Sequence, residues 1–264
     1  MVFGKQVRLN RVTKHGRMLC IPMDHSFTIG PVDGLENPEE MITKVAKGGA
    51  TAFLVHKGIV KALKKPASIG MIMHVSASTH LSPAPNRKML YSSVAEGLRL
   101  GVDAISVQVN MGSKEEPEML EQLGMVADEC DEYQVPLIAM MYPRGENIKD
   151  PQDPDVVAHV ARVGAEGGAD VVKTVYTGDV KSFRDVVRKC PVPLVLAGGS
   201  KVDTDAKVLK LAHDVMEAGA MGVTFGRNVF QHQDPTAITR ALRRIVIDRS
   251  SVEEAMEVMA AANA

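Results

Sequence analysis

The stretch ADVVKTVYTGD, residues 169–179, places a lysine inside an apolar, β-branched run bounded by turn residues, which is typical of a buried parallel strand. Lysine is rarely buried unless it is paired or used, because removing its charge from water costs free energy. Desolvation favours the neutral amine, so we expect burial to lower the pKa of Lys173. A neutral amine condenses with a ketone or aldehyde to give a Schiff base, whose iminium is an electron sink. The stretch therefore predicts a nucleophilic lysine, with a buried ion pair as the alternative.

Two further reactive side chains end similar apolar runs. Asp24 closes the run at 18–24, and Tyr142 closes the run at 136–142. Making or breaking a carbon–carbon bond beside an iminium needs a proton acceptor and a proton donor. Asp24 and Tyr142 are the candidates for these roles, provided that both runs are strands ending at the same mouth as Lys173.

Glycine-rich ends of two consecutive runs indicate an anion site. The first is LAGGS at 196–200 and the second is GVTFGR at 222–227. Glycine lets backbone N–H groups approach an anion closely, and arginine adds a charged fork suited to phosphate oxygens. Barrels often bind phosphate in the loops after their last two strands. A phosphate site is therefore predicted from Gly198, Gly199, Gly226 and Arg227.

Histidines raise the alternative of a metal site. His56 and His74 also end apolar runs and could join Asp24 or His25 around a metal ion. No HxH or HExxH spacing occurs, and an aldolase that used a metal would not require Lys173. We therefore predict no metal and no cofactor, and the roles of His56 and His74 stay open.

An alternation of elements must bring these residues together. Segments with helical spacing of apolar residues, opened by Asx-Pro pairs and closed by glycines, separate eight short apolar runs. Eight strands alternating with helices predict an α/β fold, the (β/α)8 TIM barrel, with its reactive mouth at the carboxyl ends of the strands. An open doubly wound sheet is the runner-up, although it would usually carry GxGxxG where this chain has MDHSFTIG. The runs lie at 18–24, 51–56, 68–75, 104–110, 136–142, 170–176, 192–199 and 222–227.

Composition sets the remaining expectations. Nothing divides the 264 residues, so we expect a single domain over 1–264, with about 1–17 and 251–264 capping the ends of the barrel. A net charge of -1 offers no footprint for nucleic acid or an anionic membrane. No run approaches the roughly 18 apolar residues of a membrane span, and no secretory signal is visible, so a cytoplasmic protein is expected. The three cysteines are too widely spaced to indicate a disulfide framework or a zinc site.

Four motifs together resemble the DeoC/FbaB-type class I aldolases: IPMDHS at 21–26, YPRGE at 142–146, VKTVYTGD at 172–179 and GRNVFQH at 226–232. The resemblance runs from about residue 5 to residue 255. It implies a barrel enzyme with a Schiff base on Lys173, Asp24 as proton acceptor and Tyr142 as proton donor, without a metal. The ligand-binding residues that it implies, besides the two glycine-rich ends, are His25, Ser26, Phe27, Thr28, Pro143, Arg144 and Ser200.

The resemblance also implies substrates. It favours transfer of a fragment of a deoxy-ketofructose phosphate, a sugar phosphate, to L-aspartate semialdehyde, in an alternative route to 3-dehydroquinate and the aromatic amino acids. Cleavage of fructose-1,6-bisphosphate is one alternative, disfavoured because Met140 stands where such enzymes tend to carry tryptophan. Ser26 and Ser200 depart from the usual family residues and leave open a sister reaction that joins dihydroxyacetone phosphate to aspartate semialdehyde. A homo-oligomer, in the form of a ring-shaped decamer, is the implied assembly.

A different class of function also fits part of the pattern. A non-catalytic barrel that senses a sugar phosphate would keep the glycine-rich ends, but it would have no need for Lys173, Asp24 and Tyr142 together.

Overall fold

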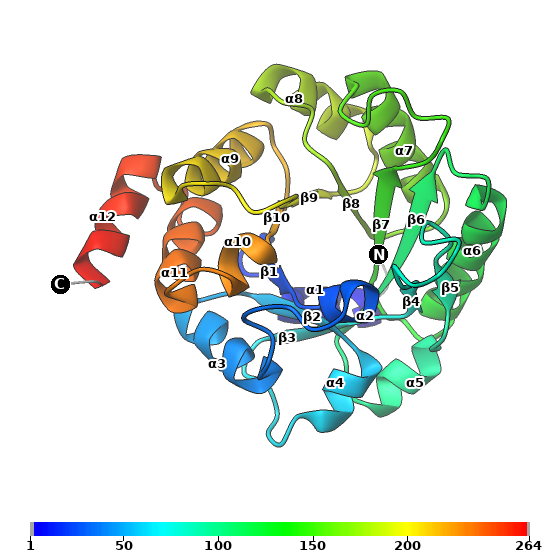
Figure 1. Cartoon of the computed structure of the whole chain (residues 1–264), viewed down its shortest axis with the longest axis horizontal. Coiled ribbons are helices and arrows are strands. Elements are labelled where there is room, and N and C mark those ends of the chain that lie inside the picture. The colour runs from blue at the N-terminus through cyan, green and yellow to red at the C-terminus, as the bar shows by residue number, and fades with distance from the viewer. Residues whose placement is uncertain (1–2, 263–264) are drawn as a thin grey trace.

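Eight parallel strands form a closed barrel in the computed structural model, which describes residues 3–262 (Figure 1). Strands neighbouring in the chain pair with one another around the barrel, and the last strand pairs with the first. All eight expected strands are present, so the predicted TIM barrel is confirmed. They are β1 (Met18–Pro22), β2 (Ala52–His56), β3 (Gly70–His74), β6 (Ala104–Met111), β7 (Leu137–Pro143), β8 (Val171–Thr174), β9 (Leu194–Ala197) and β10 (Gly222–Thr224).

Helices between the strands form a ring around the barrel (Figure 1). Three of them begin at Asx-Pro pairs as expected: the side chains of Asn37, Asp153 and Asp234 accept hydrogen bonds from backbone N–H groups in the first turn. The ring consists of α3 (Pro38–Gly48), α4 (Lys57–Ala62), α5 (Val94–Arg99), α6 (Glu116–Glu132), α7 (Pro154–Glu166), α8 (Val180–Lys189), α9 (Asp205–Glu217) and α11 (Pro235–Val246). No helix within residues 3–262 is long and apolar enough to cross a membrane.

Alternate strand residues separate two apolar cores. Outward-facing residues such as Val172 pack against the helices, while inward-facing residues such as Val171 fill the barrel interior. This division follows from the two-residue period of a strand, which sends successive side chains to opposite faces. Lys173 lies two residues after Val171 and therefore faces the interior, as Met140 does two residues after Ile138.

A helix closes the end of the barrel opposite the carboxyl ends of the strands. Val12, the last residue of α1 (Phe3–Val12), is fully buried against the interior residues. The hydroxyl of Thr51 donates to the carbonyl oxygen of Val12 at 2.8 Å and accepts from the N–H of Leu19 at 3.0 Å. The amine of Lys5 donates to the carboxylate of Asp170 at 2.7 Å. These contacts tie α1 to the amino-terminal ends of the strands.

The carboxyl-terminal segment does not lie over a barrel end. Residues 251–264 were expected to cap the barrel, but α12 (Val252–Ala262) instead packs on α11 and α9 and stands outside the ring of helices (Figure 1). Residues 1–2 and 263–264 of the two expected caps lie outside the described residues.

Four short elements lie around the mouth and were not predicted from the sequence. They are α2 (His25–Ile29), β4 (Ser76–Ala77), β5 (Met89–Leu90) and α10 (Arg227–Phe230). The helical spacing of apolar residues runs over 89–101 in the sequence, but α5 begins only at Val94, because residues 89–90 pair with residues 76–77 in a small antiparallel sheet. This pairing holds the loop between β3 and β6 beside the mouth.

Replacing Gly222 with alanine is expected to lower the free energy of unfolding by about 1–3 kcal/mol. Gly222 pairs with Met18 across β10 and β1, and a Cβ atom at Gly222 would lie 1.9 Å from the Met18 carbonyl oxygen. Denaturant unfolding followed by circular dichroism measures the change. Gly124→Ala in α6 is the matched control: a Cβ there meets nothing within 4 Å, and alanine favours a helix interior, so stability should stay equal or rise. Equal stabilities of the two variants would contradict the prediction.

Candidate active site

Lys173 stands at the floor of the mouth. It lies on β8 between Met140 of β7 and Val195 of β9 and is only 6 % exposed. Its Nζ atom lies 3.9 Å from the Met140 sulfur, at the boundary between the apolar interior and the polar mouth. The amine thus reaches a pocket of about 350 Å³ that it shares with Asp24 and Tyr142.

The charge state of Lys173 differs from the sequence expectation. Burial opposes the ammonium form, but the neighbouring Tyr142 and Asp24 favour it and raise the pKa of Lys173 above its usual value. The expectation of a lowered pKa was wrong because the residues that offset desolvation come from other strands. The resting amine is therefore protonated at neutral pH, and it must lose a proton before it can attack a carbonyl.

Asp24 and Tyr142 enter the mouth from opposite parts of the barrel. Asp24 follows β1 and precedes α2, and it is ionised: burial opposes its charge, but His25, His74 and Lys173 nearby lower its pKa to about 2. Tyr142 lies on β7 two residues after Met140, so its ring also faces inward, and the Arg144 guanidinium covers that ring at 5.4 Å from its centre. An anionic carboxylate and a phenol thus line the same pocket as the amine.

The ends of β9 and β10 form an anion cradle, defined here as Gly198, Gly199, Gly226 and Arg227. Arg227 donates to the Gly199 carbonyl oxygen at 2.9 Å, which ties the two loops together. Its Nε atom is buried without a hydrogen-bond partner among residues 3–262. A Cβ atom at Gly226 would lie 2.7 Å from the His25 ring, so only glycine lets this loop approach so closely. All four members line the mouth, with both backbone and cationic donors, and Gly199 forms the turn at φ +65.

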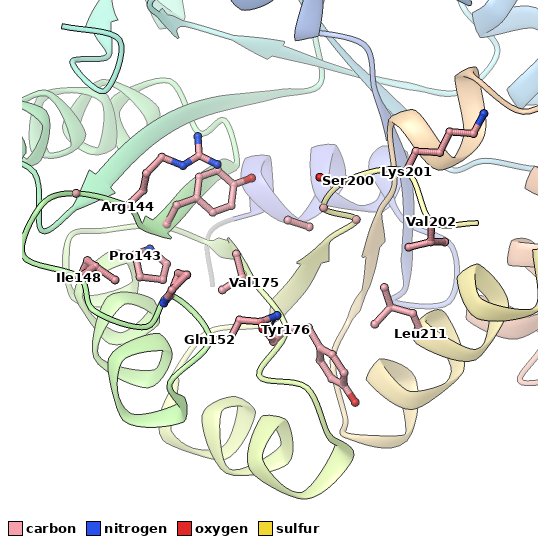
Figure 2. Close-up of a pocket in the computed structure, with 16 residues that line it drawn as sticks. Pro143, Arg144, Ile148, Gln152, Val175, Tyr176, Ser200, Lys201, Val202 and Leu211 are labelled. Carbon is pink, nitrogen blue, oxygen red and sulfur yellow. Dashed lines mark hydrogen bonds between the residues drawn. The ribbon is translucent and has the colours of Figure 1, made fainter. Parts of the chain in front are cut away.

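A second lobe of about 650 Å³ opens beside the first and shares residues such as Tyr142, Arg144 and Gly199 with it. Figure 2 shows that Pro143, the last residue of β7, and Arg144, just after it, line this lobe. Val175 and Tyr176 line it from the loop after β8, and Ser200 from the loop after β9. Pro143 and Ser200, both implied by the resemblance, thus face this lobe and not the floor around Lys173.

The residues expected to bind ligand at 24–28 fall into two groups, of which only one lines the mouth. Asp24, His25 and Thr28 line the mouth, whereas Ser26 and Phe27 are not among the described residues that line it. Phe27 packs its ring on His56 and Tyr91, with centroids 4.7 and 5.1 Å away. The single turn of α2 explains this division, because residues three apart on a helix, such as His25 and Thr28, share a face, whereas the two residues between them point elsewhere.

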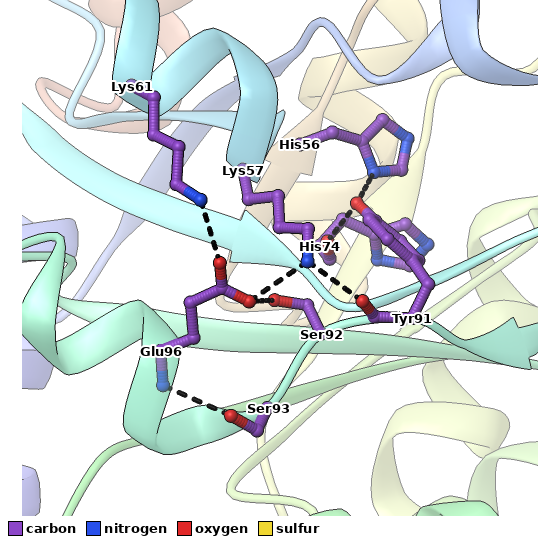
Figure 3. Close-up of polar contacts among 8 residues, drawn as sticks. All are labelled: His56, Lys57, Lys61, His74, Tyr91, Ser92, Ser93 and Glu96. Atoms are coloured by element: carbon purple, nitrogen blue, oxygen red, sulfur yellow. Dashed lines mark hydrogen bonds and ion pairs between the residues drawn. The ribbon is translucent and has the colours of Figure 1, made fainter.

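His56 and His74 belong to a hydrogen-bonded network around Tyr91 (Figure 3). The His56 ring nitrogens lie 2.5 Å from the Tyr91 hydroxyl and 3.1 Å from the Asp24 carbonyl oxygen, and Tyr91 also donates to the His74 carbonyl oxygen. Burial lowers the pKa of both histidines, that of His74 to about 3, so both are neutral. Within residues 3–262, no group of three or more histidine, cysteine or carboxylate side chains is arranged to hold a metal ion. The network supports the backbone at Asp24.

The residues that line the mouth and were missed in the sequence include His80, Lys88 and Gln108. The sequence could have indicated Gln108 as a residue of the mouth. Polar residues occupy alternate positions of β6 at Ser106, Gln108 and Asn110, on the same face as the interior residue Ala104. No sequence pattern indicated His80 and Lys88, because they lie in a loop whose return to the mouth depends on the pairing of β4 with β5.

Comparison with known proteins places this site among aldolases. The sequence model of the DeoC/LacD family aldolases matches residues 18–232. A 2-amino-3,7-dideoxy-D-threo-hept-6-ulosonate synthase of Archaeoglobus fulgidus is 42% identical over 258 residues, which cover 97% of this chain and 96% of that protein. A 2-amino-4,5-dihydroxy-6-oxo-7-(phosphonooxy)heptanoate synthase of Streptomyces griseus is 40% identical over 248 residues, covering 92% of this chain and 90% of that protein.

Among solved structures, this chain is similar to an archaeal fructose-1,6-bisphosphate aldolase whose catalytic lysine is covalently bound to the carbinolamine intermediate of the substrate. The TM-score is 0.85 at 30% identity, and the match covers 91% of this chain and 98% of that chain.

Proposed function

The chain belongs to the DeoC/LacD family of aldolases, and we propose that it uses Lys173 as a Schiff-base nucleophile to join a ketone fragment to L-aspartate semialdehyde. The product of this reaction is 2-amino-3,7-dideoxy-D-threo-hept-6-ulosonate. The observation that carries the proposal is the convergence of a buried amine, an ionised carboxylate and a phenol in one mouth.

The geometry supports a stepwise reaction. The Lys173 amine, after losing its proton, attacks the ketone of the deoxy-ketofructose phosphate, and loss of water gives the iminium. Asp24 accepts the proton of the β-hydroxyl while the carbon–carbon bond breaks and its electron pair enters the iminium, giving an enamine. Hydroxypyruvaldehyde phosphate leaves as the aldehyde product.

The second half of the reaction forms a carbon–carbon bond. The enamine carbon attacks the aldehyde carbon of L-aspartate semialdehyde, and Tyr142 donates its proton to the new alkoxide. Water then hydrolyses the regenerated iminium, which releases the product and frees the Lys173 amine. Return of the proton from Asp24 to Tyr142 restores both groups, so no oxidant or reductant is consumed.

A second candidate reaction is favoured by the anion cradle. The Streptomyces griseus relative is named for a product with a phosphonooxy group on carbon 7, beside the keto group on carbon 6. A phosphate that close to the Schiff-base carbon would suit the cradle of Gly198, Gly199, Gly226 and Arg227 next to Lys173. Dihydroxyacetone phosphate would be the ketone in that reaction.

A panel of ketones tests the two reactions. With L-aspartate semialdehyde as the common partner, the enzyme should convert deoxy-ketofructose phosphate to a product without phosphorus, identified by mass spectrometry. Faster conversion of dihydroxyacetone phosphate to a phosphorylated product would favour the second candidate. Cleavage of fructose-1,6-bisphosphate without any product from aspartate semialdehyde would contradict both.

We propose the location from the sequence and the assembly from the family resemblance. A cytoplasmic enzyme that assembles as a homo-oligomer, in the form of a decamer, is expected. Light scattering of the purified protein measures the subunit number.

A further inference from the structure

A second buried lysine faces the mouth and has no role in the reaction above. Lys88 lies in the loop just before β5, is only 6 % exposed and lines the same pocket as Asp24 and Lys173. Its amine donates to the Ser78 hydroxyl at 2.7 Å, and that hydroxyl donates to the Pro85 carbonyl oxygen at 2.6 Å. A lysine ammonium has three N–H donors, so two remain for a partner.

The surrounding contacts fix the Lys88 backbone in place. Asn110 of β6 donates to the Asn86 carbonyl oxygen at 2.8 Å, and its own side-chain oxygen accepts from Gln108 at 2.8 Å. The pairing of β4 with β5 begins at the residue after Lys88. The amine is therefore held at the mouth by strand and loop contacts that need no ligand.

The charge of this lysine is not balanced within the protein. Across residues 3–262, Lys88 forms no ion pair with a carboxylate. Burial and the Arg144 charge, opposed by Asp24, together lower its pKa to about 8, so the ammonium form predominates at neutral pH. A buried cation without a counter-ion is costly, and an anionic group on a bound ligand would offset that cost.

Positive charge thus lies on two sides of Lys173. The anion cradle follows β9 and β10 on one side of β8, while Arg144 follows β7 and Lys88 precedes β6 on the other. Arg144 and Arg227 both line the mouth, as Lys88 does. A substrate with an anionic group at each end would span the nucleophile between the two sides.

The products named for the relatives have one such end in common. Both are seven-carbon chains with a carboxylate at carbon 1, an amino group at carbon 2 and a keto group at carbon 6, and they differ at carbon 7. If Lys173 bonds carbon 6, the carbon 7 substituent lies next to the Schiff base and the carboxylate lies five carbons along the chain in the other direction. The carboxylate belongs to the part contributed by the amino aldehyde.

We infer that Lys88, assisted by Arg144, binds the carboxylate of the amino aldehyde and selects it over uncharged aldehydes. This inference rests on the proposed function, because it assigns the amino aldehyde to the side of the mouth opposite the anion cradle. Lys88 is then a specificity-determining residue, and Lys173, Asp24 and Tyr142 keep the chemistry.

Lys88→Met tests the inference, with Lys64→Met as the matched control. Lys64 is exposed in the loop before β3, at the end of the barrel opposite the mouth, so its removal changes the net charge equally without touching the site. We expect K88M to raise KM for L-aspartate semialdehyde by roughly 10–100-fold, as expected for a lost charge-assisted hydrogen bond. Its KM for the ketone and its borohydride-trapped Schiff base should match those of K64M. The preference for aspartate semialdehyde over propanal should collapse in K88M alone.

Lys88→Arg keeps a cation and should restore most of the preference for aspartate semialdehyde over propanal. Equal melting temperatures of K88M and K64M would show that the fold is intact. Equal losses by K88M with both aldehydes, or an unchanged KM for aspartate semialdehyde, would overturn the inference. If wild-type enzyme traps the ketone but makes nothing from aspartate semialdehyde, the proposed function fails instead. Succinic semialdehyde against propanal then tests Lys88: a carboxylate preference that disappears in K88M supports the inference, and one that persists overturns it.

Discussion

Replacing Lys173 with alanine is expected to lower kcat by roughly 10⁴–10⁶-fold, the scale found when a covalent nucleophile is removed. Without the amine, no iminium forms, and Asp24 and Tyr142 have no electron sink to work with. Incubation of wild-type enzyme with the ketone substrate and borohydride should add the mass of the reduced ketone to the peptide that carries Lys173. The K173A variant should show no such adduct.

A second lysine in the mouth is an alternative site for the adduct in this experiment. Lys88 is a second buried amine in the same pocket, and burial lowers its pKa to about 8, whereas the pKa of Lys173 is raised. From pKa alone, Lys88 would be the better nucleophile. We nevertheless expect the adduct on Lys173, because Lys173 has both Asp24 and Tyr142 as electrostatic neighbours that can take and return protons, whereas Lys88 has Asp24 but not Tyr142. An adduct mapped to Lys88 and retained in K173A would refute the assignment of the nucleophile.

Replacing Tyr142 with phenylalanine is expected to lower kcat by roughly 10²–10⁴-fold, the range for loss of a general acid or base. The ring still packs beneath Arg144, so substrate binding should change little. Borohydride should still trap the ketone on Lys173, because iminium formation precedes the step that needs the phenol proton. Single-turnover rates of trapping and of product formation separate the two steps.

Tyr176→Phe provides a matched control in the neighbouring lobe. The Tyr176 hydroxyl is buried without a hydrogen-bond partner among residues 3–262, and burial raises its pKa to about 12. Removing this hydroxyl should leave kcat within about twofold and should not lower stability, because no hydrogen bond is lost. A Y142F variant as active as Y176F would exclude Tyr142 as the proton donor.

The barrel could be predicted because its signals are local. Strand runs, Asx-Pro caps such as Asp153-Pro154 and strand-ending glycines each depend on a few neighbouring residues. The match of the DeoC/LacD family model confirms the predicted family of aldolases as well. The segment at 89–101 was only partly a helix because the antiparallel pairing of β5 with β4 overrides its helical spacing.

Apart from Lys173, which stood out as a charge inside an apolar run, the site could be predicted where a residue ends a strand. Asp24, Tyr142, Gly198 and Arg227 meet at one mouth because parallel strands all end there. The pKa of Lys173 could not be predicted from its own stretch, because the groups that raise it come from β1 and β7. Lys88 was missed in the sequence because a loop, and not the end of a strand, carries it to the site.

The position of α1 limits the order in which reactants move. Because Val12 and Thr51 close the far end of the barrel, the pocket at Lys173 opens toward the mouth, at the carboxyl ends of the strands. The first aldehyde must leave through the opening by which the second one enters, and both reach the same enamine. Closure of the barrel at one end thus favours a ping-pong order, in which the enzyme holds the carbon fragment while one aldehyde leaves and the other enters.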